Sequence, residues 1–382
     1  MKIIFVTRIS FIKQHLTDLY VQSIAKAFEF ELWDLSRLYN RTEVVSDAVE
    51  GSRVFESLTE FDQALADLHG DALIITNIMF NHLKKVYPVI KRHGLDLVNI
   101  TKEGLTSHLF YRGFQSLAAS ESLKEVAKYF LNNVGILRRL FNRLTNGQAR
   151  YDYLLATNNF FPEYARHFVK IHHVKYDEYL QNRGCEPVSE KPYALFLDSG
   201  ATSHPMFNRT KDQNLNAQDY QDQLSRLFDW VESTYNLKVI ISAHPKSEFP
   251  EGAFGSRPII KYKTPELIEH CSLVLSHYST SVINAILARK PLVFITSKAM
   301  MHSAQKYIAI GGLEFARELR SPVIDLGNIK AFSMAIDEGS YDRFIDRYVI
   351  DHQARDLSNE QIILDFLQRY EREKKTSQVN QP

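Results

Sequence analysis

The sequence contains few of the residues that form metal centres and disulfide frameworks. Cysteine occurs only twice in 382 residues, at Cys185 and Cys271, which lie far apart and lack the spacing of zinc ligands. No Asp-x-Asp pair occurs, so no divalent metal bridging a diphosphate is expected. Two isolated thiols are typical of a reducing compartment. We therefore predict a cytoplasmic protein that works without a metal or another cofactor.

Long apolar runs and an excess of one charge are also missing. No hydrophobic stretch reaches the length of about 18 residues that a membrane-spanning helix needs, and the opening MKIIFVTRIS has the pattern of a short strand, not of a signal peptide. The 46 Lys and Arg nearly balance the 45 Asp and Glu, which leaves a formal net charge of +1. General nucleic-acid-binding proteins usually carry a broad basic surface. We expect no nucleic-acid partner, and any anion should be bound locally.

What the sequence does contain is a regular alternation of short apolar runs and helical patterns in both halves of the chain. Strands are expected at 2–6, 30–33, 72–76, 95–100, 153–156, 194–197, 239–242, 259–261, 273–276, 292–295 and 323–325. The helices expected between them include 16–27, 58–68, 82–93, 123–144, 218–235, 265–270 and 282–288. Such alternation is typical of parallel sheets covered by helices on both faces. The predicted fold is α/β, with two doubly wound, Rossmann-like domains facing a cleft.

The boundary between the two domains is expected at residues 181–192, QNRGCEPVSEKP, a polar stretch with Gly and Pro and without periodicity. It would join an N-terminal domain, 1–180, to a second domain, 193–350. Residues 351–382 have the pattern of a terminal helix followed by a polar tail. Because open parallel sheets bind ligands at the carboxyl ends of their strands, we expect the ligand site at those ends.

Two polar stretches directly follow expected strands of the second domain. FLDSGATSHP, residues 196–205, places Asp198 where a carboxylate could take a proton from a hydroxyl group or attack an electrophilic carbon. Asp198 could equally cap the Ser-Gly turn that follows it. VIISAHPKSE, residues 239–248, places His244 where it could donate to a phosphate, and Pro245 fixes the direction of the loop. A His-Pro pair after a strand also occurs in simple turns.

A third stretch, YKTPELIEHC at residues 262–271, has the signals of a helix start. Thr264 suits the N-cap, Pro265 suits the first helical position, and Glu266 falls in the first turn. Capping alone explains these three residues. Glu266 could in addition accept hydrogen bonds from the two hydroxyl groups of a ribose.

The fourth stretch, SLVLSHYSTS at residues 272–281, ends an expected strand in a cluster of hydroxyl groups. Five of them stand within six residues: Ser276, Tyr278, Ser279, Thr280 and Ser281. An N-cap requires only one hydroxyl, and the free N–H groups at the start of the following helix add a positive end. The Gly-rich spacing and lysine of a P-loop are absent, which argues against an ATPase or a kinase. We predict a phosphate site built from this turn and His244.

In order and spacing, these motifs resemble the nucleotide-binding half of GT-B glycosyltransferases, over about residues 190–300. The resemblance is to bacterial transferases that use CMP-activated nonulosonic or octulosonic acids, such as the sialyltransferases and Kdo transferases of capsule and lipopolysaccharide assembly. Those enzymes have an acidic motif ending in Gly, a His-Pro motif and a later Ser/Thr pair. Here Asp198-Ser199-Gly200, His244-Pro245 and Ser279-Thr280 stand in the same order.

The resemblance implies a donor, an acceptor and a role for each site residue. The donor would be a CMP-activated sugar acid, and a glycan or lipid-linked glycan acceptor would bind to the first domain, without a metal. The implied roles are catalytic carboxylate for Asp198, phosphate contact or protonation for His244 with Pro245, ribose binding for Glu266, and phosphate binding for Ser279, Thr280 and Ser281. Two features depart from the pattern. Ser199 stands where many sialyltransferases carry a second acid, and the acidic motif lies in the second half of the chain.

Other functions share parts of this pattern. A teichoic-acid-type transferase of polyol phosphate uses a CDP-linked donor and has His-Pro-like motifs with a later Ser pair. A UDP-sugar transferase or 2-epimerase shares the two-domain plan but binds a diphosphate. A non-catalytic binding protein would keep the fold without turning over a donor. The nucleotide that binds separates the UDP-sugar enzymes from the others. Transfer of glycerol or ribitol phosphate with release of CMP would identify the polyol-phosphate transferase, and an unchanged function in Asp198→Ala would identify the binding protein.

Residues 123–150 combine apolar side chains with Arg138, Arg139, Arg143 and Arg150. This composition suits a helix that lies on an anionic membrane surface. Such a helix would give the protein a peripheral contact with the inner membrane, close to a lipid-linked acceptor. A core helix with a solvated basic face fits the same residues equally well.

Overall fold

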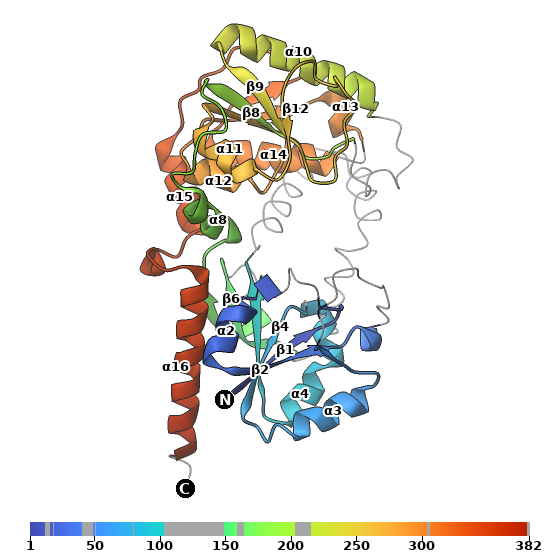
Figure 1. Ribbon diagram of the computed structural model, residues 1–382, viewed down its shortest axis with the longest axis vertical. Coiled ribbons are helices and arrows are strands. Elements are labelled where there is room, and N and C mark those ends of the chain that lie inside the picture. Colours follow the sequence, from blue (N-terminus) through green and yellow to red (C-terminus); the bar gives the residue numbers. More distant parts are fainter. Residues whose placement is uncertain are drawn as a thin grey trace, which may run out of the picture. The chain divides into compact units, whose positions relative to one another are not determined.

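The computed structural model describes residues 1–11, 16–17, 19–39, 49, 51–78, 80–102, 149–158, 164–202, 215–303 and 306–379. The chain divides into two compact units (Figure 1). Unit 1 contains the described residues of Met1–Gly104, Ser122–His172 and Asp351–Pro382, and unit 2 contains those of His173–Ile350.

Unit 1 is built on a seven-stranded parallel sheet with the order β3-β2-β1-β4-β5-β6-β7. Its strands are β1 (Lys2–Thr7), β2 (Glu29–Asp34), β3 (Arg53–Val54), β4 (Ala72–Thr76), β5 (Asp96–Thr101), β6 (Tyr151–Ala156) and β7 (Ala165–Lys170). Its helices are α2 (Val21–Ala27), α3 (Leu58–Ala66), α4 (Tyr87–Arg92) and α16 (Asn359–Val379), with short 3-10 turns η1 (Arg37–Tyr39), η2 (Phe80–Lys85) and η4 (His352–Ala354).

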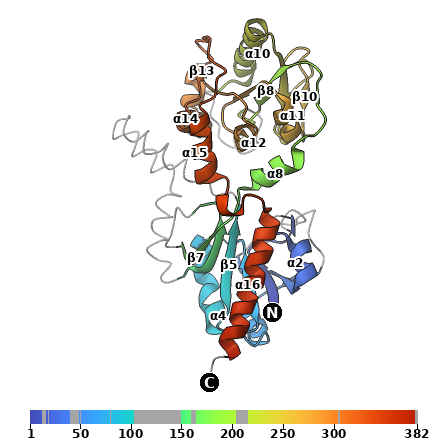
Figure 2. The same cartoon turned by 90° about the vertical axis from the view of Figure 1, so that its left-hand side faces the viewer.

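Both faces of this sheet are covered, because successive side chains of a strand point to opposite faces. On one face, Phe5 of β1 packs in a cluster with residues of α2 and α16, among them Phe366. On the other face, Ile4 packs with residues of α3 and α4, among them Phe61. Figure 2 shows α16 running along the sheet of this unit. The terminal helix predicted from the sequence thus completes a core, and it continues through Val379 into the segment expected to be a polar tail.

Unit 2 contains a six-stranded parallel sheet with the order β10-β9-β8-β11-β12-β13. Its strands are β8 (Tyr193–Leu197), β9 (Lys238–Ser242), β10 (Ile259–Ile260), β11 (Leu273–Ser276), β12 (Leu292–Thr296) and β13 (Val323–Asp325). Its helices are α8 (Val174–Asn182), α10 (Ala217–Tyr235), α11 (Thr264–His270), α12 (Val282–Leu287), α13 (Lys298–Met301), α14 (Lys306–Leu319) and α15 (Glu338–Tyr348). Counted from its first strand, this is the Rossmann order 3-2-1-4-5-6.

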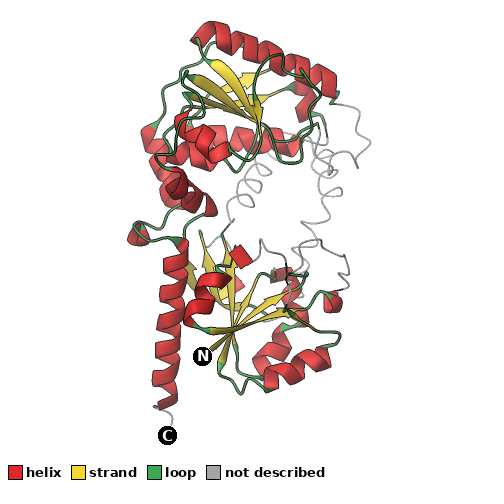
Figure 3. Cartoon of the chain, in the orientation of Figure 1, coloured by secondary structure: helices red, strands yellow, loops and turns green. Residues whose placement is uncertain are grey.

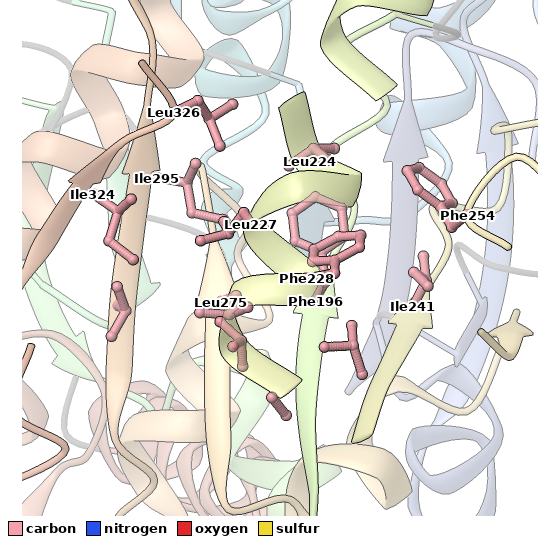
Figure 4. Packing of buried hydrophobic residues seen from close by; sticks show 14 of the residues in the cluster. Phe196, Leu224, Leu227, Phe228, Ile241, Phe254, Leu275, Ile295, Ile324 and Leu326 are labelled. Atoms are coloured by element: carbon pink, nitrogen blue, oxygen red, sulfur yellow. The ribbon is translucent and has the colours of Figure 1, made fainter. Parts of the chain in front are cut away.

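The core of unit 2 lies between α10 and one face of the sheet (Figure 4). The Asn216 side chain caps α10 by accepting hydrogen bonds from two N–H groups of its first turn. The apolar stripe of α10 includes Phe228, whose ring centroid lies 5.2 Å from that of Phe196 in β8. On the opposite face, the Tyr193 hydroxyl donates to the Leu267 carbonyl of α11 over 2.7 Å. Helices therefore cover both faces, as Figure 3 also shows, and the predicted α/β fold with two doubly wound, Rossmann-like domains is confirmed.

The chain leaves unit 1 after His172 and returns to it at Asp351. In unit 1, the Asp351 N–H donates to Nδ1 of His172 over 3.0 Å. In unit 2, the His173 N–H donates to the Val349 carbonyl over 2.8 Å. The stretch 181–192, which the sequence suggested as a linker, lies inside unit 2, where it connects α8 to β8. Residues 351–379 belong to unit 1 because their apolar side chains pack on its sheet.

Candidate functional site

Four strands of unit 2 end in one row, and the four predicted motifs follow them. The register pairs Leu197 of β8 with Ser242 of β9, Ser242 with Ile260 of β10, and Leu197 with Ser276 of β11. The residues after these strand ends therefore lie at the same carboxyl edge. The strand order reverses between β8 and β11, which is the position where open parallel sheets bind ligands.

Asp198, the first residue after β8, uses its carboxylate to join two loops. Its Oδ1 accepts the N–H of Gly200 over 2.8 Å, and its Oδ2 accepts the N–H of His244 over 3.1 Å. Gly200 has a φ of 66°, a left-handed conformation that favours glycine. The turn-capping contact considered from the sequence is therefore present, together with a bond to the next loop. A carboxylate has about four lone-pair positions, so both oxygens can still accept another hydrogen bond.

His244 is half-buried in the loop after β9, and a backbone N–H group orients its ring. Its Nδ1 accepts the Lys246 N–H over 3.1 Å. In the neutral ring the proton is therefore on Nε2, which makes Nε2 the donor. The loop is held further by the Lys261 ammonium group, which lies 3.4 Å from the Pro245 carbonyl oxygen. The site consequently has one imidazole N–H of fixed tautomer at the carboxyl edge.

The start of α11 differs in one detail from the prediction. Lys263, and not Thr264, occupies the N-cap, and Thr264 is the first helical residue. The Thr264 hydroxyl instead forms a 2.8 Å hydrogen bond with the Ser242 hydroxyl at the end of β9, which a sequence pattern does not show. Glu266 is half-buried in the first turn. The Ser242 contact places the beginning of α11, and Glu266 with it, beside the end of β9.

The turn between β11 and α12 offers fewer accessible hydroxyl groups than its sequence indicates. Ser276 is fully buried, and burial raises the pKa of the Tyr278 hydroxyl above its usual value. Ser279, Thr280 and Ser281 are half-buried. The Ser279 Oγ accepts the Ser281 N–H over 3.2 Å and keeps its own proton for a ligand. Three hydroxyl groups, not five, are therefore suitably placed at this turn.

Three hydroxyl oxygens near these strand ends are buried and have no hydrogen-bond partner among the described residues. They belong to Ser199, Ser276 and Thr296. Buried polar groups are nearly always hydrogen-bonded, so such a group needs an explanation. The three lie at or directly after the ends of β8, β11 and β12, which are neighbours in the sheet. Protein atoms cover all three oxygens, so a ligand at this edge would reach them only if the surrounding loops moved.

His277, between the strand and the turn, was not singled out by the sequence analysis. The fully buried ring donates from Nδ1 to the Ile295 carbonyl and accepts the Tyr220 hydroxyl at Nε2, both over 2.7 Å. Burial lowers the pKa of His277 to about 4, although the Ile295 bond and the Asp198 charge act in the opposite direction. The neutral ring thus ties β11, β12 and α10 together below the site. The sequence signal was a His enclosed in an apolar strand end, which is also the pattern of an ordinary core residue.

His277 gives unit 2 a measurable sensitivity to acid. A histidine with a pKa of about 4 when folded, against about 6.5 when unfolded, binds its proton first in the unfolded chain, so the free energy of unfolding falls as the pH drops through this range. We expect this loss to reach about 3 kcal/mol by pH 4. Urea unfolding at pH 7 and pH 4, compared between the wild type and His277→Gln, measures it, because all other titrations are common to both proteins. An equal loss in the two proteins would contradict the assignment.

Helix α14 approaches the backbone of the turn through two glycines. A Cβ on Gly312 would overlap the His277 carbonyl oxygen, and a Cβ on Gly311 would lie 2.5 Å from the Tyr278 ring. Farther along α14, the Phe315 ring stacks on Phe294 with centroids 6.0 Å apart. The glycine pair therefore allows a helix to lie directly against the turn and to fix its position.

A separate depression of 610 Å³ lies beyond the His244 loop. Residues between Ser247 and Lys261 line it, including Phe249 and Arg257. The Arg257 guanidinium is already paired with Asp229 and Glu232. None of the predicted site residues lines this depression, so it is not part of the candidate site.

Two features are absent from the described part of the chain. It contains no group of three or more His, Cys, Asp or Glu side chains placed to hold a metal ion. No helix in this part is both long and apolar enough to cross a bilayer. The proposed membrane-contacting segment, 123–150, lies outside the described residues except for 149 and 150.

Comparison with known proteins gives structural likeness only. No family of protein sequences and no curated protein matches the chain. Among solved structures, spinosyn forosaminyltransferase SpnP is 16% identical, with 91% of this chain and 90% of that chain covered and a TM-score of 0.36. The UDP-GlcNAc 2-epimerase of Methanocaldococcus jannaschii is 10% identical, covering 96% and 99%, with a TM-score of 0.47. Wall teichoic acid polymerase TagF is 13% identical, covering 98% and 90%, with a TM-score of 0.46. Similarities at this level assign no substrate, so a function must be argued from the site itself.

Proposed function

We propose that the protein is a metal-independent glycosyltransferase of GT-B type. Its donor is a CMP-activated nonulosonic or octulosonic acid of sialic, pseudaminic, legionaminic or Kdo type, and its acceptor is a surface glycan or lipid-linked glycan. The observation that carries the proposal is the row of strand ends in unit 2. It brings the loops of Asp198 and His244, the beginning of α11 and the hydroxyl turn to one edge, at the reversal of strand order.

The donor phosphate is proposed to lie between His244 and the hydroxyl turn. Nε2 of His244 and the hydroxyls of Ser279, Thr280 and Ser281 are the donors, and Pro245 holds the direction of the His244 loop. A monophosphate leaving group carries less charge than a diphosphate, so a few hydrogen bonds and one imidazole can stabilise it without a metal ion. This favours CMP over a nucleoside diphosphate as the leaving group. Glu266, in the first turn of α11, is proposed to accept hydrogen bonds from the ribose hydroxyls.

Asp198 is proposed to act as the catalytic carboxylate. As the acceptor hydroxyl attacks the anomeric carbon, Asp198 takes the hydroxyl proton, and the bond between that carbon and the phosphate oxygen breaks with its electron pair on CMP. His244 then donates to this oxygen. The remaining lone pairs of the Asp198 carboxylate allow this role, while its bonds to the N–H groups of Gly200 and His244 hold it in place. In the same proposal the enzyme works in the cytoplasm, and residues 123–150 contact the inner membrane peripherally.

The proposal predicts which donors release nucleotide. In EDTA, with donors presented one at a time and products separated by chromatography, we expect CMP release from CMP-sialic acid or CMP-Kdo and none from UDP-GlcNAc. Ser279→Ala should slow the release about 10- to 150-fold because one hydrogen bond to a charged group contributes about 1.5–3 kcal/mol. Ser233→Ala, an exposed serine of α10, is the matched control and should leave the rate unchanged. Release of CMP from CDP-glycerol alone would instead identify a polyol-phosphate transferase, and turnover of UDP-GlcNAc would contradict the CMP donor.

A further inference from the structure

Tyr262, directly after Lys261 at the end of β10, is exposed to an unusual degree. It is 77% exposed, whereas the other exposed large hydrophobic residues in the described part of unit 2 are 37–43% exposed. Tyrosine combines an apolar ring with a polar hydroxyl, and tyrosines are enriched at binding interfaces. Burial of the Tyr262 ring therefore contributes little to the stability of the fold.

The backbone of Tyr262 has a second unusual property. Its φ is 64°, in the left-handed region that favours glycine. A bulky residue in this region carries a conformational cost, and such residues are found most often at binding and catalytic sites. Burial of the ring does not offset the cost, because the ring is exposed.

Contacts on both sides fix where Tyr262 stands. Before it, the Lys261 ammonium group lies 3.4 Å from the carbonyl oxygen of Pro245 in the His244 loop. After it, the Thr264 hydroxyl is bonded to Ser242 at the end of β9 over 2.8 Å. Tyr262 is thus held at the carboxyl edge between the loop proposed to bind the phosphate and the helix whose first turn carries Glu266.

We propose that Tyr262 binds the donor nucleotide by stacking its ring on the pyrimidine base. This inference rests on the proposed function, which supplies a nucleotide whose ribose lies at Glu266 and whose phosphate lies at His244. If the ribose lies at Glu266 in the first turn of α11, the exposed Tyr262 ring just before that turn offers a surface for the attached base. A planar aromatic ring offers every base a face on which to stack.

Substitution by glycine separates the binding role of Tyr262 from any structural role. Glycine adopts a φ of 64° without strain, so Tyr262→Gly should raise the melting temperature slightly while it removes the ring. Calorimetric titration with CMP should show an affinity about 5- to 150-fold weaker than that of the wild type, which is the effect of losing one base–aromatic stack. Tyr262→Phe, which keeps the ring, should bind CMP nearly as well as the wild type does.

Two controls separate the loss of base stacking from other effects of the substitution. Ribose 5-phosphate, which lacks the base, should bind Tyr262→Gly and the wild type equally. Asn236→Gly relieves the same left-handed conformation, φ 54°, at the other end of β9 and should keep full CMP affinity. Wild-type CMP affinity in Tyr262→Gly would overturn the stacking role alone. A wild type that binds no CMP would overturn the proposed function and the stacking role together.

Discussion

Asp198→Ala is expected to lower the rate of sugar transfer by about a hundredfold to ten-thousandfold, the range usually lost with a general base. The measurement is kcat with a CMP-sugar acid donor, together with the affinity for CMP by calorimetry. In our proposal Asp198 contacts the acceptor and not CMP, so CMP affinity should fall less than kcat, and only through the lost bond to the N–H of His244. Formate, a small carboxylate that can enter the space left by the side chain, should restore part of the rate.

Asp198 also has a structural contact, which a second variant tests. Asp198→Asn keeps one oxygen but turns the other into a donor, which would face the N–H of either Gly200 or His244. We expect it to be inactive as well and not to respond to formate, because the amide still fills the space. Full activity in Asp198→Asn would contradict a catalytic carboxylate, since an amide cannot take the proton.

Gly312→Ala is expected to destabilise the protein and to weaken nucleotide binding together. The added Cβ would overlap the His277 carbonyl oxygen, so α14 or the turn must move. Overpacking of this kind costs about 1–3 kcal/mol and occasionally more. The upper end applies here because the obstructing atom belongs to the backbone and cannot move aside as a side chain can. We therefore expect about 3 kcal/mol, or roughly 10 °C in melting temperature. The displaced turn carries Ser279, so CMP should also bind less tightly.

The matched control for Gly312 is another helical glycine. At Gly339, near the start of α15, an added Cβ would meet only the end of the Arg343 side chain at 3.2 Å and an Asp337 carboxylate oxygen at 3.7 Å. Gly339→Ala should change the melting temperature little, or raise it, because alanine favours a helix. If Gly312→Ala were as stable as the wild type and bound CMP normally, α14 would not hold the turn in the way described.

Much of the fold could be predicted because its strands are buried on both faces. Buried parallel strands appear as continuous apolar runs, so the predicted bounds of β4, β11 and β13 match the structure. The strand β7 was missed, because most of its residues are exposed or half-buried at the edge of the sheet and their pattern is weak. Helix α14 was also missed. Two adjacent glycines disfavour a helix locally, yet in the structure they are what allows α14 to lie against His277.

The candidate site could be predicted in part for a simple topological reason. In a parallel sheet every strand points the same way, so motifs that follow neighbouring strands must meet at one edge. The pattern could not show which polar atoms the fold itself uses. The two backbone bonds of Asp198, the bond of Thr264 to Ser242 and the left-handed backbone of Tyr262 depend on contacts between residues far apart in sequence or on a local φ. These features appear only when the loops are in place.

The central claim is that the carboxyl edge of the unit 2 sheet binds CMP, and calorimetric titration tests it most directly. CMP, CDP, UMP and UDP would be titrated in EDTA into the wild type, His244→Ala and Ser279→Ala, with Ser233→Ala as the control. A ligand at about a hundred times its Kd should also stabilise the wild type by about 2.7 kcal/mol, so melting curves provide an independent reading. We predict that CMP binds most tightly, without metal, and that only the His244 and Ser279 variants weaken it. Preferential binding of UDP, or CMP affinity unchanged in both variants, would contradict the account.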